Sequence, residues 1–269
     1  MKDEFYIGWS EETPRSYSIK GRAFFLTSFI AMLLVGVIYV INQKPYANSE
    51  FQYGNIQEIT GILVKKPAWG IKTKIGGKHK TVLLVGLGKF GPEMVLSSLI
   101  QKGKLKAGQE VTFRGQLFHY QGKYGMELTE MEDSFVSATD QLNSSERNIN
   151  KLGTTVLEGE IVDAKCFFGV MNPAIKSIHR SCAIRCISGG IPAVLGIRED
   201  GEFVDYYILE SDSEELNRKI LPYVGVPVKL IGLVHHYDDW KSLDIELDNI
   251  ELVSETQTEM MFSRITTCR

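Results

Sequence analysis

The chain of 269 residues has little excess charge, few cysteines and few prolines. Its 30 lysines and arginines oppose 33 acidic residues, and the net charge of −3 argues against a protein that binds polyanions through bulk charge. Four cysteines are too few for a disulfide-dense miniprotein. A hydrophobic fraction of 43% with only 8 prolines excludes a disordered or collagen-like chain. The length therefore predicts one or two globular domains.

Motifs that mark common enzyme classes are also missing. The sequence contains no G-x-S-x-G, no H-E-x-x-H and no phosphate-binding P-loop. The glycines of residues 86–91, GLGKFG, have the spacing of a dinucleotide-binding loop, but the flanking βαβ pattern and the later acidic residue are absent. These absences favour a protein that is not an enzyme.

What the chain does contain is one long apolar run. Residues 23–41, AFFLTSFIAMLLVGVIYVI, have no charge, and at about 1.5 Å per residue they cross a bilayer core of about 30 Å. A signal peptide has a shorter apolar region and a small-residue cleavage site, so we expect a retained signal-anchor. Basic residues gather before the run and only Lys44 follows it closely. The positive-inside rule thus predicts a single-pass protein with its N-terminus in the cytoplasm and the chain after Lys44 outside it. In a bacterium this means an inner-membrane protein whose C-terminal domain is periplasmic or extracellular.

The rest of the chain contains an internal duplication. Residues 108–120, GQEVTFRGQLFHY, match residues 225–237, GVPVKLIGLVHHY, at a constant offset, and a turn and an alternating run follow each copy. Runs of β-branched residues and a short helical segment precede each copy, an order that resembles a small barrel of the OB type. The predicted fold class is mainly β, with a single N-terminal transmembrane helix followed by two duplicated OB-like β-barrel modules.

These patterns divide the chain into seven segments of differing charge. Module 1 has 12 basic and 8 acidic residues, whereas residues 138–269 have 13 basic and 21 acidic residues. We expect the lysines between Lys65 and Lys80 to be a solvated loop or a docking face for an acidic partner, and not a nucleic-acid site, because the module lies outside the cytoplasm. The segments are a cytoplasmic tail (1–22), a transmembrane helix (23–41), a linker (42–49), module 1 (50–137), a linker (138–151), module 2 (152–254) with an insertion (166–192), and a C-terminal tail (255–269).

The insertion of module 2 holds three of the four cysteines. Cys166, His179, Cys182 and Cys186 have the spacing C-x12-H-x2-C-x3-C, and module 1 has only the loop AWGIKTKIGGKHK in the corresponding place. A cluster of cysteine and histidine that is confined to one of two copies is where a specific activity is expected.

Three interpretations of this cluster are open. The cysteines could form a disulfide that braces a long loop, with Cys268 able to pair with a spare thiol. Three thiolates and an imidazole could instead bind zinc or copper. A reactive thiol could also carry out redox chemistry, with Arg180 and Arg185 as supporting cations that stabilise a thiolate.

The cysteine segment also resembles a family pattern. The run C-F-F-G-V-M-N-P…H-R-S-C-A-I-R-C-I-S-G-G-I-P, with D-E-F-Y-I-G-W near the N-terminus, is similar to an uncharacterised family of bacterial membrane-anchored proteins that accompany membrane redox systems. The resemblance covers about 35 residues around the cysteines and the first nine residues. It implies a non-catalytic accessory subunit or assembly factor of an electron-transfer complex, with Rieske, cytochrome or molybdopterin subunits as partners. The alternatives are a free-standing metal-binding or thiol-redox protein, and a cell-envelope scaffold with a disulfide-braced loop.

Overall fold

The computed structural model describes residues 13–43, 49–142, 149–199, 202–211, 213 and 215–253. The chain divides into two compact units, residues 1–46 and residues 47–269. The first unit contains one helix and the second contains two β-barrels.

Helix α1 (Arg15–Asn42) contains the predicted membrane span. It is 28 residues long, none of its residues is buried, and its mean hydropathy reaches 2.6. Thr27 satisfies its hydroxyl within the helix by donating to the carbonyl of Ala23 at 2.9 Å, as a hydroxyl in lipid must. Within the described residues, α1 is the one helix that is long and apolar enough to cross a membrane. The helix begins before residue 23, so the end of the predicted tail is helical.

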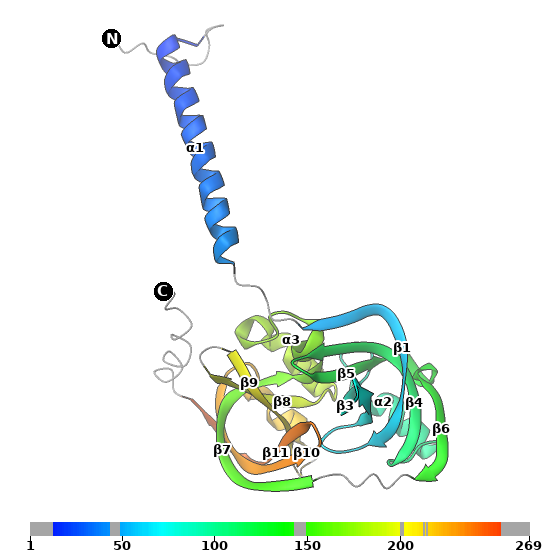
Figure 1. Cartoon of the computed structure of the whole chain (residues 1–269). Helices are drawn as coiled ribbons and strands as arrows, with labels where there is room; N and C mark the ends of the chain where they lie inside the picture. Colours follow the sequence, from blue (N-terminus) through cyan, green and yellow to red (C-terminus); the bar gives the residue numbers. More distant parts are fainter. Residues whose placement is uncertain are drawn as a thin grey trace. The chain divides into compact units, whose positions relative to one another are not determined.

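The first barrel has five strands closed into a ring, with one helix at its edge (Figure 1). The ring order is β1-β2-β3-β5-β4, β1 pairs with β4, and β3 runs parallel to β5. A further strand, β6, pairs with the N-terminal half of β4, before the part of β4 that pairs with β5. The bounds are β1 (Glu50–Val64), β2 (Gly70–Ile75), β3 (Lys78–Val85), α2 (Glu93–Gln101), β4 (Gln109–Tyr120), β5 (Lys123–Leu128), η1 (Met131–Ser134) and β6 (Phe135–Leu142).

The second barrel repeats this topology strand for strand. Its order is β7-β8-β9-β11-β10, closed by the pairing of β10 with β7, and β9 runs parallel to β11. The prediction of two duplicated OB-like modules is therefore confirmed. The bounds are β7 (Ile149–Asp163), η2 (Cys166–Val170), α3 (Lys176–Ser188), β8 (Ala193–Glu199), β9 (Glu202–Glu210), α4 (Leu216–Lys219), η3 (Leu221–Tyr223), β10 (Pro227–Tyr237) and β11 (Trp240–Leu252).

Three local expectations differ from the structure. Much of the segment expected to be a loop in module 1 forms the hairpin of β2 and β3, because Gly76 and Gly77 adopt positive φ angles of 57° and 78° in a tight turn. The predicted linker 138–151 begins inside β6 and ends inside β7. The insertion is not an irregular loop, since it forms η2 and α3. The predicted C-terminal tail 255–269 lies outside the described residues.

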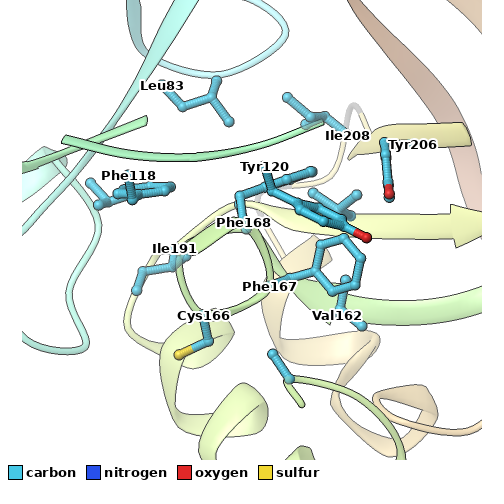
Figure 2. Close-up of a cluster of buried hydrophobic side chains, with 14 of the residues drawn as sticks. Leu83, Phe118, Tyr120, Val162, Cys166, Phe167, Phe168, Ile191, Tyr206 and Ile208 are labelled. Atoms are coloured by element: carbon cyan, nitrogen blue, oxygen red, sulfur yellow. The ribbon is translucent and has the colours of Figure 1, made fainter. Parts of the chain in front are cut away.

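The two barrels share an apolar core (Figure 2). Leu83 and Phe118 come from the first barrel, whereas Phe168 comes from η2 of the second, and all three are buried. The ring of Phe168 also packs edge-on against Trp240, with centroids 5.3 Å apart. Because aromatic side chains of this size bury large apolar areas, the two barrels stabilise each other.

The polar contacts between the barrels join basic residues of the first module to acidic residues of the second. In the turn between β10 and β11, Asp238 pairs with Lys72 at 2.9 Å, and Asp239 accepts the backbone N–H of Thr81 at 3.0 Å. The indole of Trp240 donates to the Thr81 carbonyl at 3.0 Å. Three of the lysines between Lys65 and Lys80 thus have acidic partners in the second barrel of the same chain, namely Lys66, Lys72 and Lys80.

Candidate metal centre

The four residues predicted from the cysteine spacing come together in the structure. The thiols of Cys166 and Cys182 and a ring nitrogen of His179 lie within 4.8 Å of one another. A second group, formed by Asp163, Cys166 and Cys186, is equally compact. Because both groups contain Cys166, they form one continuous cluster.

Helix α3 presents three of these side chains on one face. His179, Cys182 and Cys186 are separated by three and four residues, which is the spacing of neighbours along one side of an α-helix. Cys166 is the first residue of η2, just beyond the end of β7. His179, Cys166 and Cys186 are buried, with 3%, 4% and 1% of their surface exposed. Cys182 is half-buried, so it is the ligand that solvent can reach.

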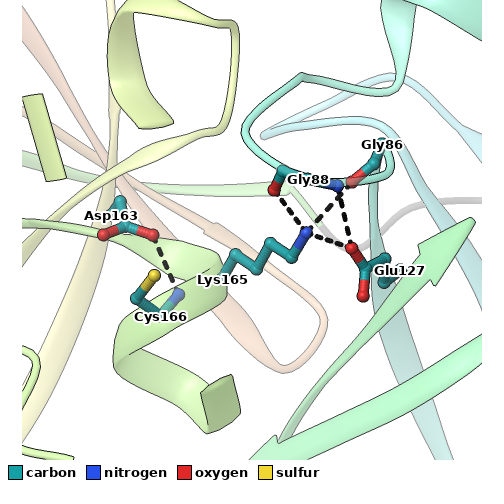
Figure 3. A network of polar contacts seen from close by, with 6 residues as sticks. All are labelled: Gly86, Gly88, Glu127, Asp163, Lys165 and Cys166. Carbon is teal, nitrogen blue, oxygen red and sulfur yellow. Dashed lines mark hydrogen bonds and ion pairs between the residues drawn. The ribbon is translucent and has the colours of Figure 1, made fainter. Parts of the chain in front are cut away.

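Asp163, which was not among the predicted site residues, orients two members of the cluster. Its side chain is completely buried at the end of β7. One carboxylate oxygen accepts the backbone N–H of Cys166 at 2.8 Å, and the other lies 3.1 Å from Nε2 of His179 (Figure 3 shows the first of these contacts). With Nε2 paired to Asp163, Nδ1 is the ring nitrogen left for a metal. A carboxylate behind a ligating histidine is a common outer-shell arrangement in metal sites.

The thiols of Cys166 and Cys186 share a hydrogen bond. This bond raises the pKa of Cys166, and burial raises it further, whereas the same bond lowers the pKa of Cys186. Of the two thiols, Cys186 therefore loses its proton more readily, and the shared proton stays with Cys166. A metal ion that binds here displaces that proton, so binding weakens as the pH falls.

The cation that contacts the cluster is Lys89, from the loop between β3 and α2 of the first barrel. Its ammonium donates to Sγ of Cys182 at 2.8 Å. This bond, and then the charges of the three thiols, raise the pKa of Lys89. Arg180 and Arg185, predicted to support the cluster, do not take this role in the structure. Arg180 donates to the Pro222 carbonyl at 2.8 Å, and Arg185 is exposed.

Buried Lys165 fixes the loop that carries Lys89 (Figure 3). Its ammonium pairs with the buried carboxylate of Glu127 and donates to the carbonyls of Gly86 and Gly88 at 3.2 and 2.6 Å. At the other end of the loop, the N–H of Gly91 donates to the carbonyl of Gly189 at 2.8 Å. The GLGKFG loop is thus held against the end of α3.

The contact between this loop and α3 requires a glycine. A Cβ atom on Gly189 would lie 2.0 Å from the carbonyl oxygen of Lys89, which is far inside any allowed contact. Any larger residue at this position would therefore push the loop and Lys89 away from Cys182.

The three described cysteines are free thiols. The predicted disulfide is therefore not confirmed among Cys166, Cys182 and Cys186, and Cys268 lies outside the described residues. Comparison of the chain with protein-family models and with curated proteins gives no match. The chemistry of the cluster consequently rests on its own geometry.

Two members of the site escaped the sequence analysis, and each left a faint signal. Asp163 stands three residues before Cys166 at the end of an apolar strand, a place where a buried carboxylate needs a partner. Lys89 belongs to the glycine-rich loop that the sequence analysis considered only for dinucleotides. Gly91 serves the close approach to the end of α3 instead, since a Cβ atom there would lie 2.4 Å from the carbonyl oxygen of Gly190.

Proposed function

We propose that the protein is a membrane-anchored metal-binding protein that holds one zinc or copper(I) ion with Cys166, His179, Cys182 and Cys186. The observation that carries the proposal is the pair of compact ligand groups joined through Cys166. Sulfur and imidazole ligands suit these soft or borderline ions and suit magnesium or calcium poorly.

The donor spacing fits such an ion. Zinc–sulfur bonds of about 2.3 Å and zinc–nitrogen bonds of about 2.0 Å place tetrahedral ligand atoms about 3.5–3.8 Å apart. Within each of the two groups the donor atoms lie no more than 4.8 Å apart, and an ion held by all four residues would draw the two groups together around Cys166. The buried carboxylate of Asp163 already orients His179 for this purpose.

The arrangement favours metal binding over thiol redox chemistry. A thiol that attacks external disulfides has to be exposed and free to change partners. Here two of the three thiols, those of Cys166 and Cys186, are buried. The participation of a buried, oriented histidine is also explained by a metal and not by disulfide exchange.

We further propose that this metal-binding protein serves as an accessory subunit or assembly factor of a membrane electron-transfer complex. The support is the resemblance of the cysteine segment to the family that accompanies Rieske and molybdopterin systems, together with the apolar helix α1. The charge bias around that helix supports a periplasmic site for the barrels. Copurification of a Rieske, cytochrome or molybdopterin subunit with the full chain in mild detergent tests this role; purification of the chain alone from native membranes would count against it.

The metal proposal is tested on the full chain in mild detergent, in a Cys268→Ser background that removes the thiol outside the cluster. We expect elemental analysis to find one zinc or copper ion per chain and thiol titration to find the three cysteines masked until a chelator is added. Cys182→Ser and His179→Ala should lose most of the metal, whereas Cys268→Ser alone should keep it. A metal-free protein whose mass is lower by two hydrogens would instead show a disulfide and overturn the proposal.

A further inference from the structure

We propose that Lys89 is a charge-compensating residue of the metal site, and that the first barrel is therefore part of that site. This inference rests on the proposed function. All four ligands come from the second barrel, but the ammonium of Lys89 reaches across the junction to Sγ of Cys182 at 2.8 Å. A barrel that contributes no ligand thus contributes a charge.

The charge of the loaded cluster explains why a cation is needed. A divalent ion bound by three thiolates and a neutral imidazole retains one net negative charge. Most of the cluster is buried, and an uncompensated charge in such surroundings is strongly unfavourable. One ammonium at hydrogen-bonding distance offsets the net charge of a divalent ion and its four ligands, and the buried carboxylate of Asp163 beside them makes that cation more necessary still.

Two other cations near the cluster, Arg180 and Lys165, are already held by other groups. Arg180 donates to the carbonyl of Pro222, and Lys165 is held by Glu127 and by the carbonyls of the loop. Lys89 alone among these three has a thiol as its partner. Its position in the cluster is therefore not duplicated by Arg180 or Lys165.

The position of Lys89 is built into the junction between the barrels. The loop is held at one end by the ammonium of Lys165 and at the other by the bond from Gly91 to Gly189. Gly189 also leaves the space that the Lys89 backbone fills. A surface lysine that touched Cys182 by chance would not need a buried ion pair and a glycine to hold its loop in place.

The hydrogen bond from Lys89 is also made to Cys182, the ligand that exchange with an external chelator would release first. Cys182 is the half-buried thiol, so an external chelator reaches it before the buried ligands. A hydrogen bond from a cation stabilises the lone pairs of a thiolate and makes that sulfur a weaker nucleophile toward external reagents. The same bond should raise the energy of a sulfur-to-metal charge-transfer transition.

Cobalt(II) is the probe for this inference, because its thiolate complexes have charge-transfer absorption. The full chain in detergent, in the Cys268→Ser background, is titrated with cobalt(II) in the absence of oxygen. The variants are Lys89→Met, Lys89→Arg and the control Lys104→Met, which changes an exposed lysine just after α2. We expect Lys89→Met to lower the affinity about 10- to 100-fold and to move the charge-transfer band to longer wavelength. Lys89→Arg should keep most of the affinity, and Lys104→Met should match the parent.

The outcomes separate the inference from the proposal beneath it. If the parent binds one cobalt ion but Lys89→Met has the same affinity and the same band, the inference is wrong and the metal site stands. A fall in affinity without a shift of the band would mean that Lys89 acts only by holding the loop, which also overturns the inference. A parent chain that binds no cobalt would overturn the proposed function and this inference together.

Discussion

Replacement of Asp163 by asparagine should disable the histidine ligand without changing the size of the buried side chain. The amide oxygen can still accept the N–H of Cys166, which lies 2.8 Å from the carboxylate in the native protein. The amide nitrogen then faces Nε2 of His179 and can only donate. Nε2 must therefore act as an acceptor, which places the ring proton on Nδ1 and removes the lone pair that a metal needs.

The size of this effect follows from what the carboxylate does. Mutation of residues that orient a metal ligand costs about 10- to 100-fold in affinity, or about 1.4–2.7 kcal/mol. We expect Asp163→Asn near the upper end of this range, because the change forces the wrong tautomer and also removes a negative charge beside the ion. The assay is competition for zinc between the full chain and a chromogenic chelator.

Asp205→Asn is the matched control for this experiment. Asp205 lies in the same barrel and bonds to Lys241 and Tyr207, away from the thiol cluster, so its amide variant should bind zinc as the parent does. If Asp163→Asn keeps a native circular dichroism spectrum and also keeps the parental affinity, the carboxylate does not set the tautomer of His179, and the reasoning is refuted.

Three other predictions test the frame around the site. Lys165→Met should lower the free energy of unfolding by about 3–5 kcal/mol, because it leaves the Glu127 carboxylate buried and unpaired, and adding Glu127→Gln should restore much of that loss in denaturant titrations. Burial raises the pKa of Glu160, although nearby positive groups oppose this shift. The stability that the protonated Glu160 contributes is therefore complete below about pH 4.3, the pKa of a free glutamate, and is lost as the pH rises through the folded-state pKa. Glu160→Gln should therefore gain stability relative to the parent over that rise, and a difference that stays constant with pH would contradict the assignment. A chain that starts at residue 49 should leave the membrane fraction without detergent, whereas the full chain should not; a truncated chain that stays membrane-bound would show a second attachment.

The barrels could be predicted because their determinants are local and occur twice. Gly115 and Gly232 illustrate this, since they occupy equivalent positions in β4 and β10. A Cβ atom at Gly115 would lie 2.3 Å from the backbone oxygen of Glu127, and one at Gly232 would lie 2.5 Å from that of Asp244. The same close approach of strands requires glycine in both copies, so the repeated pattern reports a real constraint of the fold.

The site could be predicted only where its members are close in sequence. The spacing of His179, Cys182 and Cys186 places them on one helical face whatever surrounds the helix. Lys89 reaches the cluster from a different barrel, and nothing in the local sequence indicates that contact. Arg180 and Arg185 are close to the cysteines in sequence, but on a helix adjacent positions point in different directions, so closeness in sequence does not bring their side chains to the thiols.

The fit between Gly189 and the backbone of Lys89 limits how this site can be moved between proteins. Residues 149–253 contain every ligand, yet a graft of this segment alone would leave Cys182 without its cation and would expose Phe168 and Trp240, which the first barrel covers. The first barrel, which has no cysteine, is therefore still needed, and gene rearrangement cannot remove it without a loss at the cluster. Inheritance of the proposed metal site, and any attempt to engineer it into another scaffold, has to carry both copies as a single module.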